Sequence, residues 1–139
     1  MRKIIVFSLL LLTGTFIYGQ SDKTIKSLGI VTKETVRHTD TKNSYTESVE
    51  KFDENGNLIE EIEYSQDKTI KKHRQWTYNE NNDKTSELEL DANGKIISKI
   101  IYEYDGKLKI SKKEYNEKGK LISWKSYSYF TKTGKLTGE

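Results

Sequence analysis

Hydrophobic and polar residues alternate along most of this chain, in short runs separated by turn-like segments. Leu58 and Ile62 share one parity, whereas Glu61 and Glu63 take the other. Alternation with a period of two between turn signals predicts half-buried β-strands. The same alternation recurs in residues 70–78, 87–90 and 96–102.

A seven-residue turn motif separates these runs. Residues 52–58 show it: an aromatic residue, three polar residues, a glycine, a polar residue and an aliphatic residue. The glycine supplies the positive φ that a hairpin loop needs after a type I turn. Copies start at Phe52, Tyr64, Tyr78, Leu90, Tyr102, Tyr115 and Phe130, the turn glycines are Gly56, Gly94, Gly106, Gly119 and Gly134, and Lys68 and Asn82 replace glycine in two decayed copies.

The copies are 12 to 15 residues apart, which fits one strand plus one turn. The sequence therefore predicts an all-β fold, a single curved antiparallel meander of about eight or nine strands. Residues 29–37 and 44–51 are expected to form a further hairpin upstream. Tyr115 has the opposite parity to Leu108 and Ile110, which predicts a β-bulge between them. No amphipathic helix of useful length is expected, so the sheet must curl, pair with a second copy or bind a partner.

The N-terminus has the pattern of a secretory signal peptide. Arg2 and Lys3 precede residues 4–12, which are apolar except for Ser8, and small residues follow. We predict cleavage after Gly19, which divides the chain into a signal peptide (1–19) and a β-repeat domain (20–139). The alternative, an uncleaved anchor, would need about 20 apolar residues. The predicted location is periplasmic or extracellular.

Composition agrees with one small domain that holds together without disulfides. The chain has no Cys and no Pro, and 33% of its residues are hydrophobic while 32% are charged. This balance suits a sheet with one wet face. Residues 20–63 carry 6 basic and 10 acidic side chains, whereas residues 104–139 carry 9 and 4. Such a gradient favours head-to-tail association or partner steering, and a solvated surface with scattered Lys is the plainer alternative.

The aromatic-Asp-x-x-Gly-x-Leu pattern runs from Phe52 to Leu136. It resembles the YD repeat of Rhs-type proteins and is similar to the MORN-like repeats of a family of antitoxins. The resemblance implies a β-repeat architecture, and the antitoxin family implies a protein partner. Rhs-type repeats form shells around a toxic cargo, but seven short units are too few to enclose a folded domain.

Catalytic and metal-binding patterns are weak in this sequence. His38 and Asp40 could share a strand face, but zinc takes three or four ligands, and His73 has no second His or Cys at ligand spacing. The Asp-rich turns lack the further acidic ligands of a calcium loop. Glu61 and Glu63 could form a carboxylate pair for glycoside hydrolysis, and a solvated strand face is the alternative. We expect no cofactor and no metal.

Aromatic residues are the strongest candidates for binding. Trp76, Tyr78, Trp124 and Tyr127 could offer a platform for a sugar or an extended peptide, and cross-strand packing is the alternative. Trp124 and Tyr127 have opposite parity, so at least one should lie away from the main apolar face. The sequence thus favours an exported, non-enzymatic module that binds a protein or glycan of the cell envelope, and the exported location argues against nucleic acid. Self-association through a sheet edge or face is the second hypothesis, and a carbohydrate-active enzyme is the third.

Overall fold

The computed structural model describes residues 3–9, 22–39, 43–130 and 136–137. Within them the chain forms a nine-stranded sheet, a separate two-stranded hairpin and one short helix. The prediction of an all-β antiparallel meander is confirmed. The elements are β1 (Lys3–Leu9), α1 (Asp22–Leu28), β2 (Ile30–His38), β3 (Ser44–Phe52), β4 (Leu58–Tyr64), β5 (Ile70–Tyr78), β6 (Lys84–Leu90), β7 (Ile96–Asp105), β8 (Leu108–Asn116), β9 (Leu121–Ser126), β10 (Tyr129–Phe130) and β11 (Leu136–Thr137).

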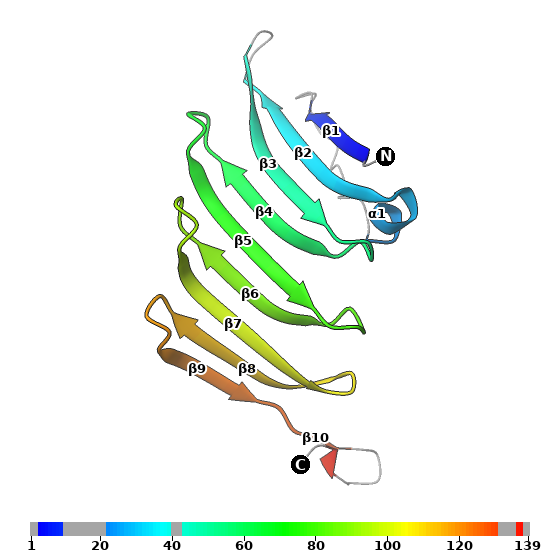
Figure 1. The fold of residues 1–139 in the computed structure, drawn as a ribbon, viewed down its shortest axis with the longest axis vertical. Coiled ribbons are helices and arrows are strands. Elements are labelled where there is room, and N and C mark those ends of the chain that lie inside the picture. Colours follow the sequence, from blue (N-terminus) through cyan, green and yellow to red (C-terminus); the bar gives the residue numbers. More distant parts are fainter. Residues whose placement is uncertain (1–2, 10–21, 40–42, 131–135, 138–139) are drawn as a thin grey trace.

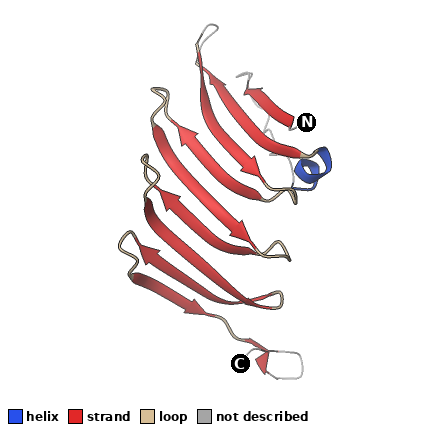
Figure 2. Cartoon of the chain, in the orientation of Figure 1, coloured by secondary structure: helices blue, strands red, loops and turns tan. Residues whose placement is uncertain are grey.

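The strands of the large sheet lie in the order of the sequence (Figure 1). From β2 to β9 each strand pairs antiparallel with the next, and the predicted hairpin of residues 29–37 and 44–51 is the β2–β3 pair. β1 is the exception, because it pairs parallel with β2. Figure 2 shows a single twisted layer of strands with α1 at the N-terminal end of the sheet.

The repeated turn motif builds a repeated hairpin. Two backbone hydrogen bonds recur in each of five loops. The N–H of the first loop residue donates to the carbonyl of the fifth, and the N–H of the fourth residue donates to the carbonyl of the first. The fourth residue has positive φ, and Lys68 (67°) and Asn82 (63°) adopt it without being glycine. In four of these loops an Asp or Asn side chain at the first position accepts two further backbone N–H groups. The motif therefore fixes the loops through backbone and Asx-type bonds.

One predicted copy departs from this geometry. Residues 102–108 do not form the longer loop, because Asp105 pairs directly with Leu108 across a two-residue turn at Gly106 (φ 56°). The register then shifts in β8, since Glu103 pairs with Ser111 but Tyr104 pairs with Lys109. Ile110 is the extra residue, so the predicted β-bulge is confirmed.

A single layer leaves most of the chain in contact with water. The accessible surface is 10533 Å², whereas a compact chain of 16.2 kDa exposes about 7,500 Å². The only hydrophobic cluster of buried residues in the described parts joins Ile25, Ile30 and Phe52, with Leu58 packed against it. Ile25 belongs to α1, a short helix that the sequence analysis missed. It covers the N-terminal end of the sheet.

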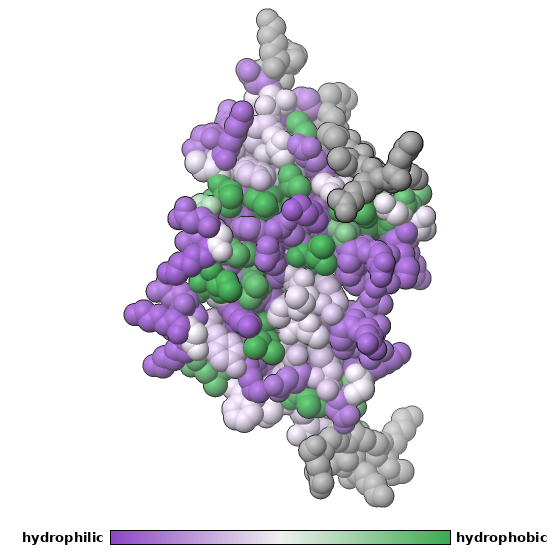
Figure 3. Space-filling view, viewed as in Figure 1, coloured by the Kyte–Doolittle hydropathy of each residue, from purple (hydrophilic) through white to green (hydrophobic). Residues whose placement is uncertain are grey.

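Both faces of the sheet carry charged and apolar side chains, so the expectation of one wet face is wrong. Ile62 lies opposite His73 on one face, while Trp76 lies opposite Glu87 on the other. Figure 3 shows apolar patches interspersed with polar and charged side chains on the visible face. The bulges at the hairpins shift the pairing by one residue. Apolar residues that share parity within their own strands therefore do not all lie on the same face of the sheet.

Two sequence predictions fall partly outside the described residues. Gly134 lies in residues 131–135, although the β10–β11 pair flanks that segment as the last repeat predicts. Residues 3–9 of the predicted signal peptide form β1, and residues 10–21 are not described. Export and cleavage therefore stay predictions. Within the described residues, no helix has the length and apolar character needed to cross a membrane.

Candidate functional site

The four aromatic candidates separate into two packed residues and two exposed ones. Trp76 in β5 is only 7% exposed, and Trp124 in β9 is 64% exposed. Tyr78 is half-buried, and Tyr127 is 38% exposed. Trp124 and Tyr127 are thus the members of this set that can meet a partner without rearrangement of the sheet.

Trp76 lies beneath two cations. The Arg74 guanidinium carbon is 5.1 Å from the centroid of its ring, and the Lys84 ammonium is 5.5 Å away. Cation–π contacts of this length stabilise the packing by about 0.5–1 kcal/mol each. The indole Nε1 is buried without a hydrogen-bond partner. Trp76 therefore serves the sheet as a packed residue rather than an open platform.

Tyr78 joins two neighbouring hairpins through a hydrogen bond of its side chain. Its hydroxyl donates to the carbonyl of Leu58 at 2.8 Å. Tyr104 and Tyr129 repeat this bond at the same distance, to the carbonyls of Lys84 and Lys109. Each tyrosine reaches back 20 residues. The sequence analysis missed these hydrogen bonds, because their acceptors are backbone carbonyls that no side-chain pattern marks.

Trp124 projects from the C-terminal end of the sheet. It pairs with Lys113, which pairs with Ile101, so these three residues share a face. Tyr115 lies on the same face, opposite Lys99. We call Ile101, Lys113, Tyr115 and Trp124 the Trp124 surface. Beside it lies an open hollow of about 310 Å³, lined by Ile96, Lys99, Ile101, Tyr115, Asn116, Glu117 and Gly119.

Tyr127 belongs to the opposite face. Its N–H donates to the carbonyl of Ile110 at 2.9 Å, which holds it at the bulge in β8. Burial raises the pKa of Tyr102, and Glu87, Tyr104 and Tyr127 add to this shift, so Tyr127 lies near Tyr102. Tyr102 pairs with Lys112, which is adjacent to Lys113 on the strand and therefore faces the other way. The two exposed aromatic candidates do not form one site.

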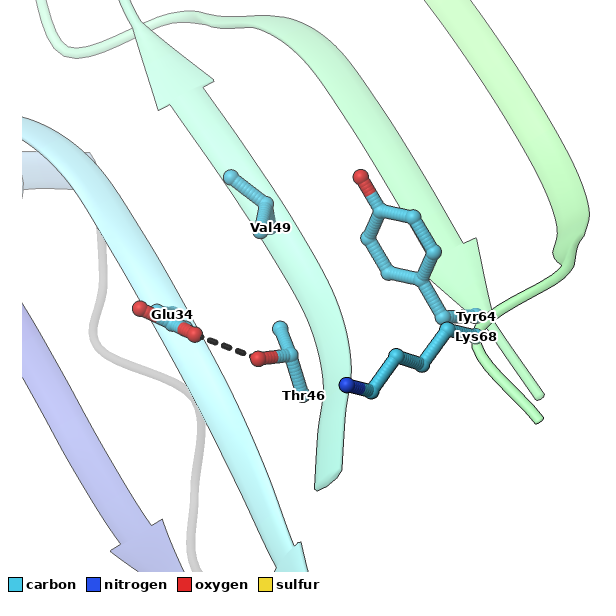
Figure 4. Close-up of a pocket in the computed structure, with 5 residues that line it drawn as sticks. All are labelled: Glu34, Thr46, Val49, Tyr64 and Lys68. Atoms are coloured by element: carbon cyan, nitrogen blue, oxygen red, sulfur yellow. Dashed lines mark hydrogen bonds between the residues drawn. The ribbon is translucent and has the colours of Figure 1, made fainter. Parts of the chain in front are cut away.

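A second open hollow, of about 370 Å³, lies near the N-terminal end of the sheet (Figure 4). It is lined by Glu34, Thr46, Val49, Tyr64 and Lys68, and the Thr46 hydroxyl donates to Glu34 at 2.6 Å. In Figure 4 the Tyr64 ring stands beside Val49, and the Lys68 side chain extends toward Thr46. Its residues include a carboxylate and an ammonium, but neither Cys nor His.

The acidic run in β4 is neutralised by its neighbours. Glu61 accepts hydrogen bonds from Arg74, and the Glu63 carboxylate lies 3.5 Å from the Lys72 ammonium. These two ion pairs link β4 to β5. The geometry gives the two carboxylates a structural role on the sheet rather than a free catalytic pair.

Glu60 lies on the face opposite Glu61 and has three partners. It forms an ion pair with Lys51, and it contacts His73 Nε2 at 3.0 Å and Gln75 Nε2 at 2.9 Å. Burial acts to raise the pKa of Glu60, but hydrogen bonds from Lys51, Gln75 and His73 outweigh it and lower the pKa to about 2. The sequence analysis missed this cluster, because its residues come from three strands, β3, β4 and β5, whose register it did not assign.

Metal binding finds no support in the described part of the chain. His73 is engaged by Glu60, and no group of three or more His, Cys, Asp or Glu side chains there could hold an ion. His38 lies at the end of β2, and Asp40 lies outside the described residues. The predicted pairing of His38 with Asp40 therefore stays untested.

Fold and surfaces together define a class, a single-layer antiparallel β-meander with repeated turns and an exposed aromatic end. Over residues 18–138 the sequence matches the model of a protein family described as "Uncharacterised protein", and the chain belongs to that family. No curated protein matches the sequence.

Proposed function

We propose that this chain is an exported, non-enzymatic interaction module that binds a protein or glycan of the cell envelope through the Trp124 surface. The observation that carries the proposal is the 64% exposure of Trp124 on a face that also holds Tyr115 and a hollow. Exposed Trp and Tyr side chains give much of the affinity of binding surfaces, because each buries a large, rigid apolar area. The resemblance to YD and MORN-like repeats agrees with an interaction role and stays a prediction.

The surface combines stacking area with positive charge. Lys99 is exposed on the same face as Tyr115 and Trp124, whereas Lys113 on that face is ion-paired with Glu103 at 2.6 Å. The C-terminal third of the chain is basic. An aromatic ring with a nearby ammonium group suits an acidic glycan or an acidic, apolar peptide. A partner with these properties would bury Trp124 and pair with Lys99.

A matched pair of substitutions tests the binding surface. Trp124→Ala removes the ring, whereas Leu28→Ala removes an apolar side chain that is 46% exposed at the other end of the molecule. Binding to purified peptidoglycan and to proteins of the envelope extract is measured for both variants and the wild type. Loss of a central aromatic contact lowers affinity by about tenfold or more. If Trp124→Ala retains the affinity of the wild type and of Leu28→Ala, the proposed surface is wrong.

Export is tested separately. The full chain is expressed in a host with a secretory pathway, and the N-terminus of the protein in the envelope or medium is sequenced. We expect it to begin at Gln20. Intact chain retained in the cytoplasm would contradict export without affecting the binding test.

A further inference from the structure

Two opposite charges line the hollow at the N-terminal end of the sheet without neutralising each other. The Glu34 carboxylate comes from β2, and the Lys68 ammonium comes from the loop between β4 and β5 (Figure 4). Neither group forms an ion pair with a residue that the structure describes. Glu34 accepts a hydrogen bond from the Thr46 hydroxyl at 2.6 Å, and its carboxylate has lone pairs for further donors. Both charges are therefore open to a molecule that enters the hollow.

The backbone at Lys68 is a second, independent observation. Lys68 has a φ of 67° at the loop position that Gly56, Gly94 and Gly119 occupy in three of the five similar loops. Positive φ raises the free energy of a residue that has a Cβ atom, and Asn82, in the fifth loop, is of a type that tolerates it better than lysine. Strained residues of this kind cluster at sites that hold a ligand. The turn does not require a lysine here, whereas an anionic group in the hollow would.

The other side chains of the hollow define what else a ligand must carry. The Tyr64 ring stands beside Val49, and the Lys68 side chain extends toward Thr46 (Figure 4). The ring and the valine offer an apolar surface, and Tyr64 is half-buried. The volume of about 370 Å³ lies within the range of about 300–1,000 Å³ that is typical of small-molecule sites. A matching ligand is small and combines an apolar group with charge.

The pair of charges distinguishes a zwitterion from a singly charged ligand. A ligand carboxylate pairs well with the Lys68 ammonium, and a ligand ammonium pairs well with the Glu34 carboxylate. A simple anion would gain the first contact but would lie near the negative charge of Glu34, and a simple cation would meet the charge of Lys68. Only a molecule with both groups gains both contacts.

We propose that this hollow binds a small zwitterion, an α-amino acid with an apolar side chain, whose carboxylate pairs with Lys68 and whose ammonium pairs with Glu34. Tyr64 and Val49 cover its side chain. The inference goes beyond the proposed binding function, because the hollow lies on β2, β3 and β4, whereas the Trp124 surface lies on β7, β8 and β9. Either proposal can fail without the other.

The test uses phenylalanine and two derivatives that each lack one charge. Phenylalaninamide keeps the ammonium without the carboxylate, and N-acetylphenylalanine keeps the carboxylate without the ammonium. The backbone amide signals of the isotope-labelled full chain are followed by NMR during each titration. We expect phenylalanine to shift the signals of Glu34, Thr46 and Lys68 and to bind about tenfold or more tightly than either derivative. Equal binding of N-acetylphenylalanine, or no shift of these signals up to the solubility of phenylalanine, overturns the proposal.

Lys68→Gly separates the ligand contact from the stability of the fold. Glycine adopts the φ of 67° without strain, so the variant keeps the loop and becomes more stable. It should nevertheless bind phenylalanine about tenfold or more weakly, because the ammonium is lost. Lys68→Arg keeps the charge and should retain binding. The matched control Asn82→Gly changes the same backbone conformation in the loop between β5 and β6 and should bind as the wild type does. Lys68→Gly with the affinity of the wild type would show that the proposal is wrong.

Glu34→Gln tests the other charge. Gln keeps an oxygen that accepts a hydrogen bond from the Thr46 hydroxyl, so the hollow keeps its shape. The variant should lose the preference for phenylalanine over N-acetylphenylalanine, because the group that recognises the ligand ammonium is gone. A preference that survives this substitution would contradict the role of Glu34 and, with it, the proposal.

Discussion

Replacing Glu60 with Gln is expected to remove a large share of the stability of this sheet at neutral pH. The Glu60 side chain is 16% exposed and bonds to Lys51, His73 and Gln75. Gln keeps the shape of the side chain but loses the negative charge. The substitution therefore isolates the contribution of that charge to a cluster that joins β3, β4 and β5.

The expected loss of unfolding free energy follows from the pKa of Glu60. Burial alone would raise the pKa of Glu60, but hydrogen bonds from Lys51, Gln75 and His73 lower it from 4.5 to about 2. A shift of this size corresponds to about 3 kcal/mol of unfolding free energy. Because the folded pKa lies below the unfolded pKa, the contribution is fully present above about pH 4.5 and is lost as the pH falls toward 2.

Urea unfolding at several pH values measures this effect. We expect Glu60→Gln to lower the unfolding free energy by about 2–3 kcal/mol at pH 7 and to converge with the wild type near pH 2. The control is Glu63→Gln in the same strand. Its side chain is 39% exposed and lies 3.5 Å from Lys72, so its loss should cost less than about 0.5 kcal/mol. Equal losses for the two variants, or a Glu60→Gln loss that does not change with pH, would refute this reasoning.

Three further predictions follow from single side chains. Trp76→Phe should leave a red-shifted fluorescence from exposed Trp124 that acrylamide quenches readily, and Trp124→Phe should leave a blue-shifted, protected emission. Tyr104→Phe removes the bond to the Lys84 carbonyl and should lower the unfolding free energy by about 1 kcal/mol. Lys68→Gly should raise it by about 0.5–1 kcal/mol, because glycine adopts the φ of 67° without strain.

The turns explain why the meander could be predicted from the sequence. The φ at Gly56, Gly94 and Gly119 is positive as the motif requires, and Lys68 and Asn82 occupy the same conformation. These loops are set by residues within five positions of each other, so the local sequence specifies them. The bulge in β8 was predictable for the same reason, since one change of parity marks it.

The two faces could not be derived in that way. Ile62 and Trp76 look equivalent within their own strands, but the register places them on opposite faces. Register depends on how each loop closes, and a shift of one residue exchanges the faces. The Glu60 cluster and the tyrosine hydrogen bonds depend on the same long-range pairing, so the spacing of their residues along the chain indicates neither of them.

The candidate surface was predicted only in part. Trp124 and Tyr127 are exposed as a binding role requires, but Trp76 and Tyr78 pack into the sheet. All four are aromatic residues near strand ends, and the sequence offers no difference between them. The exposure of the two tryptophans differs because the cations Arg74 and Lys84 cover Trp76, whereas Trp124 lies on the last strand of the large sheet.

This difference between the ends of the sheet connects the fold to the proposed function. In a single layer each strand contacts only its neighbours, so stability is a sum of adjacent pairings, and the ends need caps. At the N-terminal end α1 supplies one by packing Ile25 against Ile30 and Phe52. At the C-terminal end Leu121, Ile122 and Trp124 stay exposed among the described residues. A partner therefore buries the most apolar area at the C-terminal end of the sheet, which is where the proposed binding surface lies.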